Sequence, residues 1–89
     1  MTPTIINLAM PVANQEYAVL LPSCDLCIIQ ARVAATIQLA YKQGESNTKF
    51  ITIPSGCSKS IQYGTSGFNA MIYVMSSVIN QVLEIECWN

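Results

Sequence analysis

The sequence predicts an all-β protein, either a small antiparallel β-sandwich or a jelly-roll-like barrel of roughly six to eight short strands. Runs of β-branched and aromatic residues recur at close, fairly regular intervals along the chain. Clusters of Pro, Gly, Ser and Asn separate these runs, as expected for turns. The end of the chain alternates with a period of two, which is typical of a half-buried strand. Leu83, Ile85 and Cys87 fall on one face of this segment, and Glu84, Glu86 and Trp88 fall on the other.

The N-terminal segment, residues 1–15, is predicted to be either an extended arm or an edge strand. Pro3 and Pro11 enclose a short apolar patch, and proline at both ends disfavours a helix. As an arm, the segment would dock on a neighbouring protein; as an edge strand, it would belong to the sandwich. The patch supplies candidate partner-interface residues: Ile5, Ile6 and Leu8. Residues 16–89 are predicted to form a single β-sandwich domain.

Strands and turns can be assigned in order after this segment. The predicted strands cover residues 16–21, 26–32, 35–41, 49–53 and 58–63. The polar stretch 42–48 is predicted to be an exposed loop between two strands. A turn is expected at Pro54-Ser55-Gly56, with a positive φ angle at Gly56, and a second turn is expected at Gly64–Gly67.

The segment from Ala70 to Trp88 is predicted to be a β-hairpin that closes the sandwich. A helix starting at Ser76 is the alternative, because Ser is a good N-cap and Val78, Val82 and Ile85 recur near helical spacing. We favour strands, because β-branched and aromatic residues dominate the segment.

The composition is unusual for a protein that stands alone. The chain has 89 residues, enough for one core, of which 52% are hydrophobic and only 10% are charged. An ordinary domain is charged at about a quarter of its residues. Because so few charged groups cover the surface, we expect part of it to be buried against partners in a homo-oligomer, a dimer or a trimer.

Several classes of partner are disfavoured by the same composition. No apolar run approaches the roughly 20 residues of a spanning helix, so we expect no membrane insertion. The N-terminus lacks the basic and apolar regions of a secretion signal, which favours folding in the cytoplasm. We expect no nucleic-acid binding, because the basic residues do not cluster. They are Arg32, Lys42, Lys49 and Lys59, and the net charge is −1.

The four cysteines allow three interpretations. Cys24 and Cys27 form a C-x2-C pair, which with Cys57 and Cys87 could supply four thiolates to zinc. Alternatively, the four residues could form disulfides. We favour a third interpretation, in which they are reduced thiols that serve as small buried hydrophobes, since a second C-x2-C pair is missing and the cytoplasm is reducing. We therefore expect no metal and no cofactor.

The residues do not form a recognisable catalytic set, so we expect the protein not to be an enzyme. The sequence contains no histidine, which removes the usual general base. Glu84 and Glu86 lie on one strand face, whereas a glycosidase pair holds its substrate between opposed carboxylates. Trp88 is the remaining binding candidate, either as an exposed anchor for a partner or as a lid over the edge of its own domain.

A series of short segments occurs in order along residues 16–88: Glu16-Tyr17, Leu21-Pro22, Ile28–Arg32, Ile37–Tyr41, Phe50–Gly56, Ile72–Val74 and Val82–Ile85 with Trp88. In these segments the chain resembles a family of small proteins encoded among the head genes of tailed bacteriophages. The chain departs from the family pattern at Cys24, Cys27 and Cys57, and at Ser77–Asn80, where a Gly-containing turn is expected.

This resemblance implies a virion structural protein with a β-sandwich or jelly-roll-like fold. The leading role is capsid decoration, in which copies bind the outer surface of the major capsid protein shell and cement it. A neck, tail or head-fibre component is the nearest alternative, followed by a small β-sandwich binding module. In the leading role, the protein is made in the host cytoplasm and is located on the capsid surface of the virion.

Overall fold

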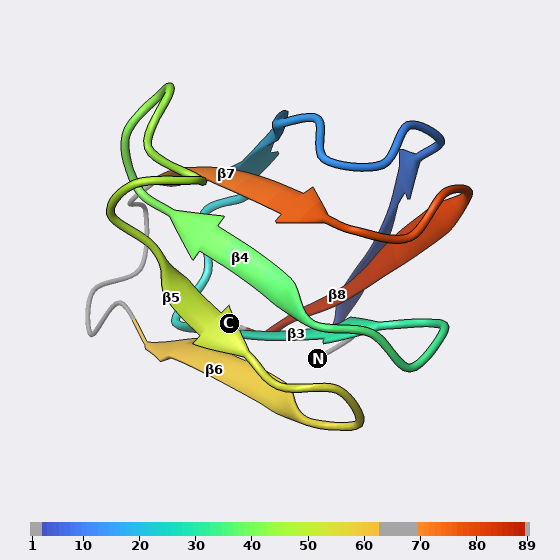
Figure 1. Cartoon of the computed structure of the whole chain (residues 1–89). Coiled ribbons are helices and arrows are strands. Elements are labelled where there is room, and N and C mark those ends of the chain that lie inside the picture. Colours follow the sequence, from blue (N-terminus) through green and yellow to red (C-terminus); the bar gives the residue numbers. More distant parts are fainter. Residues whose placement is uncertain (1–2, 63–69, 89) are drawn as a thin grey trace.

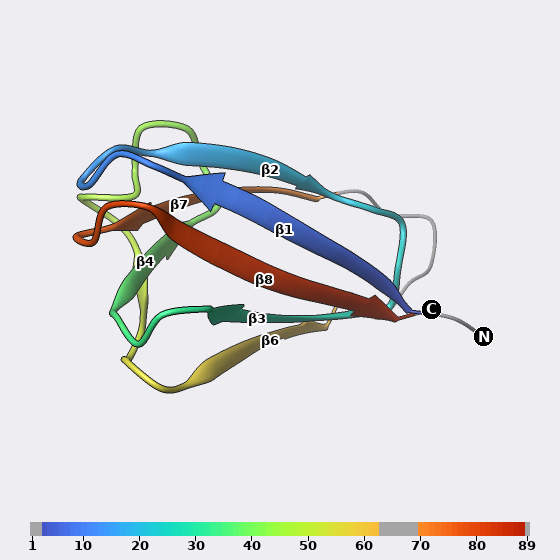
Figure 2. The same cartoon turned by 90° about the vertical axis from the view of Figure 1, so that its right-hand side faces the viewer.

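The computed structural model describes residues 3–62 and 70–88, which form two antiparallel sheets packed face to face (Figures 1 and 2). All regular structure in these residues is β, as predicted. The strands are β1 (Thr4–Met10), β2 (Tyr17–Leu21), β3 (Leu26–Ala31), β4 (Ile37–Ala40), β5 (Ile51–Ile53), β6 (Ser58–Gln62), β7 (Ala70–Ser76) and β8 (Gln81–Trp88). The predicted turn at Gly64–Gly67 and the end of the predicted strand 58–63 lie outside the described residues.

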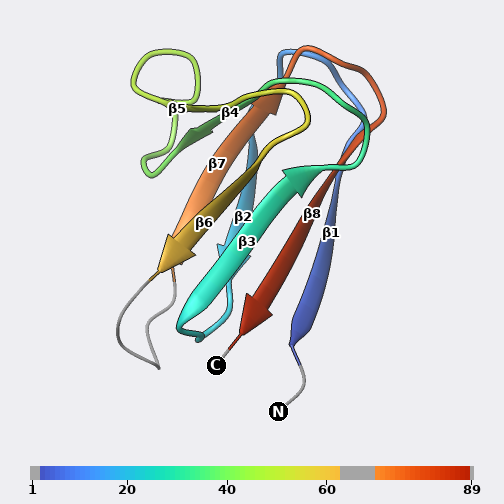
Figure 3. The same ribbon diagram turned by 90° about the horizontal axis from the view of Figure 1, so that it is seen from below.

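The strand order identifies the fold as a jelly roll. One sheet has the order β1-β8-β3-β6, and Figure 3 shows these four strands side by side. The other sheet has the order β2-β7-β4-β5. Strands therefore pair as β1 with β8, β2 with β7, β3 with β6, and β4 with β5, as if one long hairpin had been rolled up. Among the described strands, β4 and β5 are the only consecutive pair in one sheet, and the members of every other consecutive pair belong to different sheets.

The predicted hairpin over residues 70–88 is therefore wrong, although both of its strands exist. β7 and β8 lie in different sheets, and residues 77–80 carry the chain across the sandwich. This connection lies beside the β1–β2 connection at one end of the molecule (Figure 2). The two are tied by backbone hydrogen bonds, from Asn14 N to Ser76 O at 2.7 Å and from Asn80 N to Pro11 O at 3.2 Å.

Local geometry explains why a strand and a tight turn win over a helix at Ser76. Ser76 is the last residue of β7, and its Oγ accepts a hydrogen bond from Val78 N at 3.1 Å, which starts the turn instead of capping a helix. Asn80 has φ 55°, in the left-handed region that Asn tolerates. The predicted positive φ at Gly56 is confirmed at 79°.

The core lies between the sheets and is built from the inward side of each alternating strand. β8 follows the predicted pattern, with Leu83, Ile85 and Cys87 buried and the intervening side chains facing outward. The other members of the hydrophobic core cluster come from both sheets and one connection: Met10, Leu21, Cys24, Cys27, Ile29, Ile37, Leu39, Ile53, Ile72 and Val74. Burial of this apolar surface is the main stabilising contribution to the fold.

Residues 4–10 form an edge strand in the sandwich. β1 pairs with β8 along its whole length, from Thr4 opposite Cys87 to Met10 opposite Gln81. Ile6 and Leu8 pack against the core, and Met10 is buried, whereas Ile5 points outward and is 68% exposed. Successive side chains of this strand therefore alternate between the core and the outer surface of the sandwich.

A buried glutamine connects β8 to the crossing between β3 and β4. Gln81 is 1% exposed, and its Oε1 accepts hydrogen bonds from Val33 N and Val82 N, both at 3.1 Å. Its Nε2 donates to Val33 O at 3.0 Å. The side chain thus satisfies backbone groups that the crossing leaves without a strand partner.

The loop between β4 and β5 is held by Glu16, which precedes β2. The Glu16 carboxylate accepts hydrogen bonds from Gly44 N at 2.9 Å and from Ser46 N at 3.2 Å. Ser46 is buried and Glu45 is half-buried, whereas the other residues of the stretch 42–48 are exposed, as we predicted for the loop. A side-chain hydrogen bond with Ser46, followed by the bond from Gly44 N, lowers the pKa of Glu16 below its ordinary value of 4.5.

We expect Glu16→Gln to reduce the free energy of unfolding by about 0.5–1 kcal/mol at pH 7, a value discounted for solvent exposure of the carboxylate. Because the folded-state pKa is depressed, this stabilisation is fully present above pH 4.5 and is lost as the pH falls through the folded-state pKa. Urea unfolding of both proteins from pH 7 to pH 2.5 measures the difference. Glu45→Gln, which makes the same charge change within the loop that Glu16 holds, is the control and should be nearly neutral; an equal loss in both variants would contradict the prediction.

Candidate functional site

The two outer faces of the sandwich differ in charge. The strands β2, β7, β4 and β5 contain no Lys, Arg, Asp or Glu on either side. The outer face of the other sheet carries Glu84 and Glu86 from β8, with Arg32 just beyond the end of β3. One side of the molecule is therefore suited to remain in water, and the other is not.

Side chains that point away from the core on β2, β7 and β4 form a continuous apolar-rich surface. Leu20 lies directly opposite Met71, and these side chains are 54% and 41% exposed. Their chain neighbours, Leu21 and Ile72, point inward and are fully buried. We call this surface the uncharged face; its residues are Ala18, Leu20, Gln38, Met71, Tyr73 and Met75.

A shallow depression of about 330 Å³ lies at one end of the uncharged face. Its lining contains no charged group, so polar contacts there would be made by amides and hydroxyls. A partner could fill it without desolvating an ion, which would otherwise be costly. The lining residues are Asn14, Thr36, Gln38, Asn47, Met75 and Ser77.

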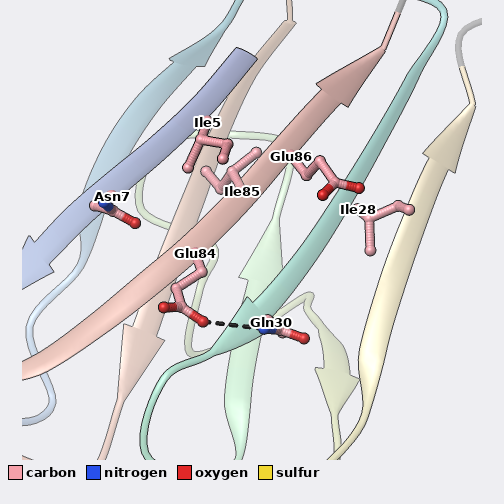
Figure 4. Close-up of a pocket in the computed structure, with 7 residues that line it drawn as sticks. All are labelled: Ile5, Asn7, Ile28, Gln30, Glu84, Ile85 and Glu86. Atoms are coloured by element: carbon pink, nitrogen blue, oxygen red, sulfur yellow. Dashed lines mark hydrogen bonds between the residues drawn. The ribbon is translucent and has the colours of Figure 1, made fainter. Parts of the chain in front are cut away.

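The opposite surface, which we call the acidic face, is formed by outward residues of β1, β8 and β3. It contains a depression of about 300 Å³ in which side chains of the three strands meet (Figure 4). Two isoleucines flank the carboxylates, while the buried Ile85 contributes to the floor. The outward residues are Ile5, Asn7, Ile28, Gln30, Glu84 and Glu86.

The carboxylates on the acidic face are hydrogen-bonded to neighbours. Glu84 accepts from Gln30 Nε2 at 3.0 Å (Figure 4) and from Arg32 Nε at 2.9 Å. These bonds, that from Gln30 first, lower the pKa of Glu84 and keep it ionised at neutral pH. Glu86 Oε1 accepts from Trp88 Nε1 at 2.8 Å. Both carboxylates point to the same side of β8, as predicted, and do not form an opposed acid–base pair.

The candidate partner-interface residues from the sequence fall into two groups. Ile5 and Trp88 lie on the acidic face, where Trp88 is 37% exposed and its indole is oriented by Glu86. Ile6 and Leu8 face the other way and pack against the core. Ile5 and Trp88 are therefore the most exposed of the four candidates, and Ile6 and Leu8 are partly buried.

Three of the four cysteines converge inside the sandwich. Cys24, Cys27 and Cys87 are each at most 3% exposed. Cys27 Sγ lies 3.2 Å from Cys24 Sγ and 2.9 Å from Cys87 Sγ. Burial is the largest cause that raises the pKa of Cys87 above its ordinary value of 9.0, so this residue is a thiol at neutral pH. Cys57, between β5 and β6, is exposed and does not join the group.

This arrangement does not match the four-thiolate zinc site considered from the sequence. A tetrahedral zinc with Zn–S bonds of about 2.3 Å separates its ligand sulfurs by about 3.8 Å. Two of the three sulfur separations here are shorter, and the fourth thiol lies outside the group. The preferred interpretation of buried hydrophobic thiols fits Cys24, Cys27 and Cys87, but not Cys57.

The uncharged face was not identified from the sequence, although a signal for it exists. A strand with one face in water alternates between apolar and polar residues, whereas β2 (YAVLL) and β7 (AMIYVMS) are apolar on both faces over most of their length. Such strands need cover on both sides, or they leave an exposed apolar surface.

Comparison with family models, curated proteins and solved structures finds no match to this chain. Within residues 3–62 and 70–88, no helix has the length and apolar character needed to cross a membrane.

Proposed function

We propose that this chain is a non-enzymatic structural protein of a tailed-bacteriophage virion, and specifically a capsid decoration protein. In this role it binds the outer surface of the major capsid protein shell and cements adjacent subunits. The observation that carries the proposal is the uncharged face, an outer sheet surface without a charged residue on a domain with few charges overall.

The uncharged face indicates how the protein is oriented on the shell. Burying Leu20 and Met71 against a protein removes apolar surface from water, which favours association. Turning the acidic face toward the shell would instead desolvate Glu84 and Glu86, at considerable cost without matched partners. In the proposed complex, the uncharged face lies on the shell and the acidic face lies toward solvent.

Two further considerations support a virion role. The jelly roll is an architecture that viral capsid domains share with lectins, which supports a virion role by analogy of fold. The strand and turn sequences of residues 16–88 resemble those of small proteins encoded with phage head genes. Self-association into a dimer or a trimer would bury a further part of the apolar-rich surface, and closed symmetry would limit its growth.

The test is to add the purified protein to tailed-bacteriophage capsids that were assembled without it. A decoration protein should co-sediment saturably, at a number of copies comparable to that of the capsid subunits. The decorated capsids should also survive a higher temperature, because each copy buries surface across a subunit joint.

Other results would assign a different role. Saturation at about a dozen copies or fewer would contradict decoration and favour a neck, tail or head-fibre component, which occupies one vertex or the tail. Absence of binding would overturn the virion proposal and leave a small β-sandwich binding module. Bovine serum albumin in place of the protein controls for non-specific sedimentation.

A further inference from the structure

The three buried cysteines bring together parts of the chain that are distant in sequence. Cys24 lies in the connection between β2 and β3, Cys27 lies near the start of β3, and Cys87 lies near the end of β8. Cys27 is the central member, since its sulfur is within 3.2 Å of both others. The sequence alone predicted that these residues are separate buried hydrophobes, and the proposed virion role does not use them.

The register of β3 and β8 makes Cys27 and Cys87 a suitable pair for a disulfide. They are direct cross-strand partners, and the same register extended by one residue beyond β3 places Arg32, five residues after Cys27, opposite Val82, five residues before Cys87. Arg32 N donates to Val82 O at 2.9 Å, which marks that position as hydrogen-bonded. Because the two kinds of position alternate, Cys27 and Cys87 occupy a non-hydrogen-bonded position, where Cα atoms are about 4.5 Å apart. Disulfides span Cα separations of about 4.4–6.8 Å, so the backbone need not move far.

Disulfide formation also suits the surroundings better than metal binding does. A metal would require thiolates, and negative charge is costly to create at sites that are at most 3% exposed. It would also require the sulfurs to move apart, whereas a disulfide requires one pair to close further and leaves a neutral product.

We propose that Cys27 and Cys87 are a redox site, which a small peroxide converts into a disulfide joining β3 to β8 inside the sandwich. The sulfur of Cys27 attacks one oxygen of hydrogen peroxide, the O–O bond breaks, and the thiol proton passes to the departing oxygen, so that a sulfenic acid and one water are formed. The sulfur of Cys87 then attacks the sulfur of Cys27, the S–O bond breaks, and a second water leaves. Two thiols lose two electrons and two protons in total, and the peroxide is reduced to two waters.

Cys24 is the competing partner for the oxidised Cys27, but its product would differ measurably. A Cys24–Cys27 disulfide closes a loop of a few residues, whereas Cys27–Cys87 links positions 60 residues apart. Cross-links that close long loops remove more entropy from the unfolded chain. Only the Cys27–Cys87 disulfide should therefore raise the melting temperature substantially, by about 8–15 °C.

The experiment treats folded Cys57→Ala protein with hydrogen peroxide, since this background removes the exposed thiol that would join two molecules. Remaining thiols are alkylated, and the protein is digested without reduction and analysed by mass spectrometry. Before alkylation, we expect the intact mass of the treated protein to be about 2 Da below that of the reduced protein. After digestion, we expect a peptide containing Cys27 linked to one containing Cys87. The melting temperature should rise and should return to its initial value with dithiothreitol.

Two further variants in the same background separate the alternatives. Cys24→Ala should retain the rise in melting temperature, and Cys87→Ala should lose it. The proposal is overturned if the three thiols stay reduced in folded protein under conditions that oxidise Cys57 of the wild type, or if the only link is Cys24–Cys27. A zinc or copper adduct in native mass spectrometry that blocks oxidation would also overturn it. The peptide measurement does not use these two variants, so their misfolding would not prevent a result.

Discussion

Replacing Ile72 with Ala should lower the free energy of unfolding by about 3 kcal/mol, whereas Met71→Ala beside it should lower it by about 0.5 kcal/mol. Ile72 is fully buried between the sheets, so its truncation loses apolar burial and leaves a cavity. Met71 is 41% exposed on the uncharged face, and less of its surface is lost from the fold. Adjacent residues of one strand should thus differ several-fold in their effect.

Urea and thermal unfolding of the wild type and both variants measure this difference. In a domain of this size, about 3 kcal/mol corresponds to a melting temperature lower by roughly 12–20 °C, which is a large part of the stability of a typical small domain. Equal losses in the two variants would mean that both faces of β7 are covered in the protein as purified. That result would show that the uncharged face is already occupied, for example by a second copy.

Met71→Glu should reduce attachment to the capsid by at least about 100-fold, while changing the free energy of unfolding by less than about 1 kcal/mol. A carboxylate at position 71, opposite Leu20 on the uncharged face, would be desolvated in the complex without a partner, which costs several kcal/mol. In the unbound protein the same carboxylate would remain in water, so the fold should tolerate it. Co-sedimentation with capsids across a range of protein concentrations gives the affinity of each variant.

Ile5→Glu is the matched control, because Ile5 is an equally apolar strand residue that is 68% exposed on the acidic face. It should retain wild-type attachment. Loss of attachment in Ile5→Glu and not in Met71→Glu would reverse the proposed orientation and would make the face containing Trp88 the contact. Sedimentation velocity of the same proteins without capsid shows separately whether Met71→Glu disrupts a homo-oligomer.

Side-chain periodicity allowed the faces of individual strands to be predicted. The alternation of Glu84 and Glu86 with Leu83 and Ile85 is a local property of the backbone, because successive side chains of a strand point to opposite sides. The turn at Gly56 is local in the same sense, since glycine readily adopts a positive φ. The side-chain alternation and the glycine turn do not depend on which sheet contains the segment.

Pairing between strands is not local, and the sequence alone did not determine it. β7 and β8 are separated by only four residues, a length compatible with a hairpin, yet they belong to different sheets. Nothing in the alternation of either strand distinguishes the two arrangements. The meeting of Cys27 and Cys87 depends on the same long-range register, so the cysteine cluster could not be predicted from spacing.

The rolled-up order of the strands also bears on how the chain folds during synthesis. β8 leaves the ribosome after the other seven strands, yet it lies between β1 and β3 in its sheet. Until it arrives, β1 has no neighbour in that sheet, and Ile6 and Leu8 have no complete core to join. Pairings between such distant segments are slow to form, because a long stretch of chain must be closed before any contact compensates for the lost entropy. The nascent protein must therefore pass through a stage with an open sheet and exposed apolar side chains, during which a neighbouring nascent copy can supply the missing strand.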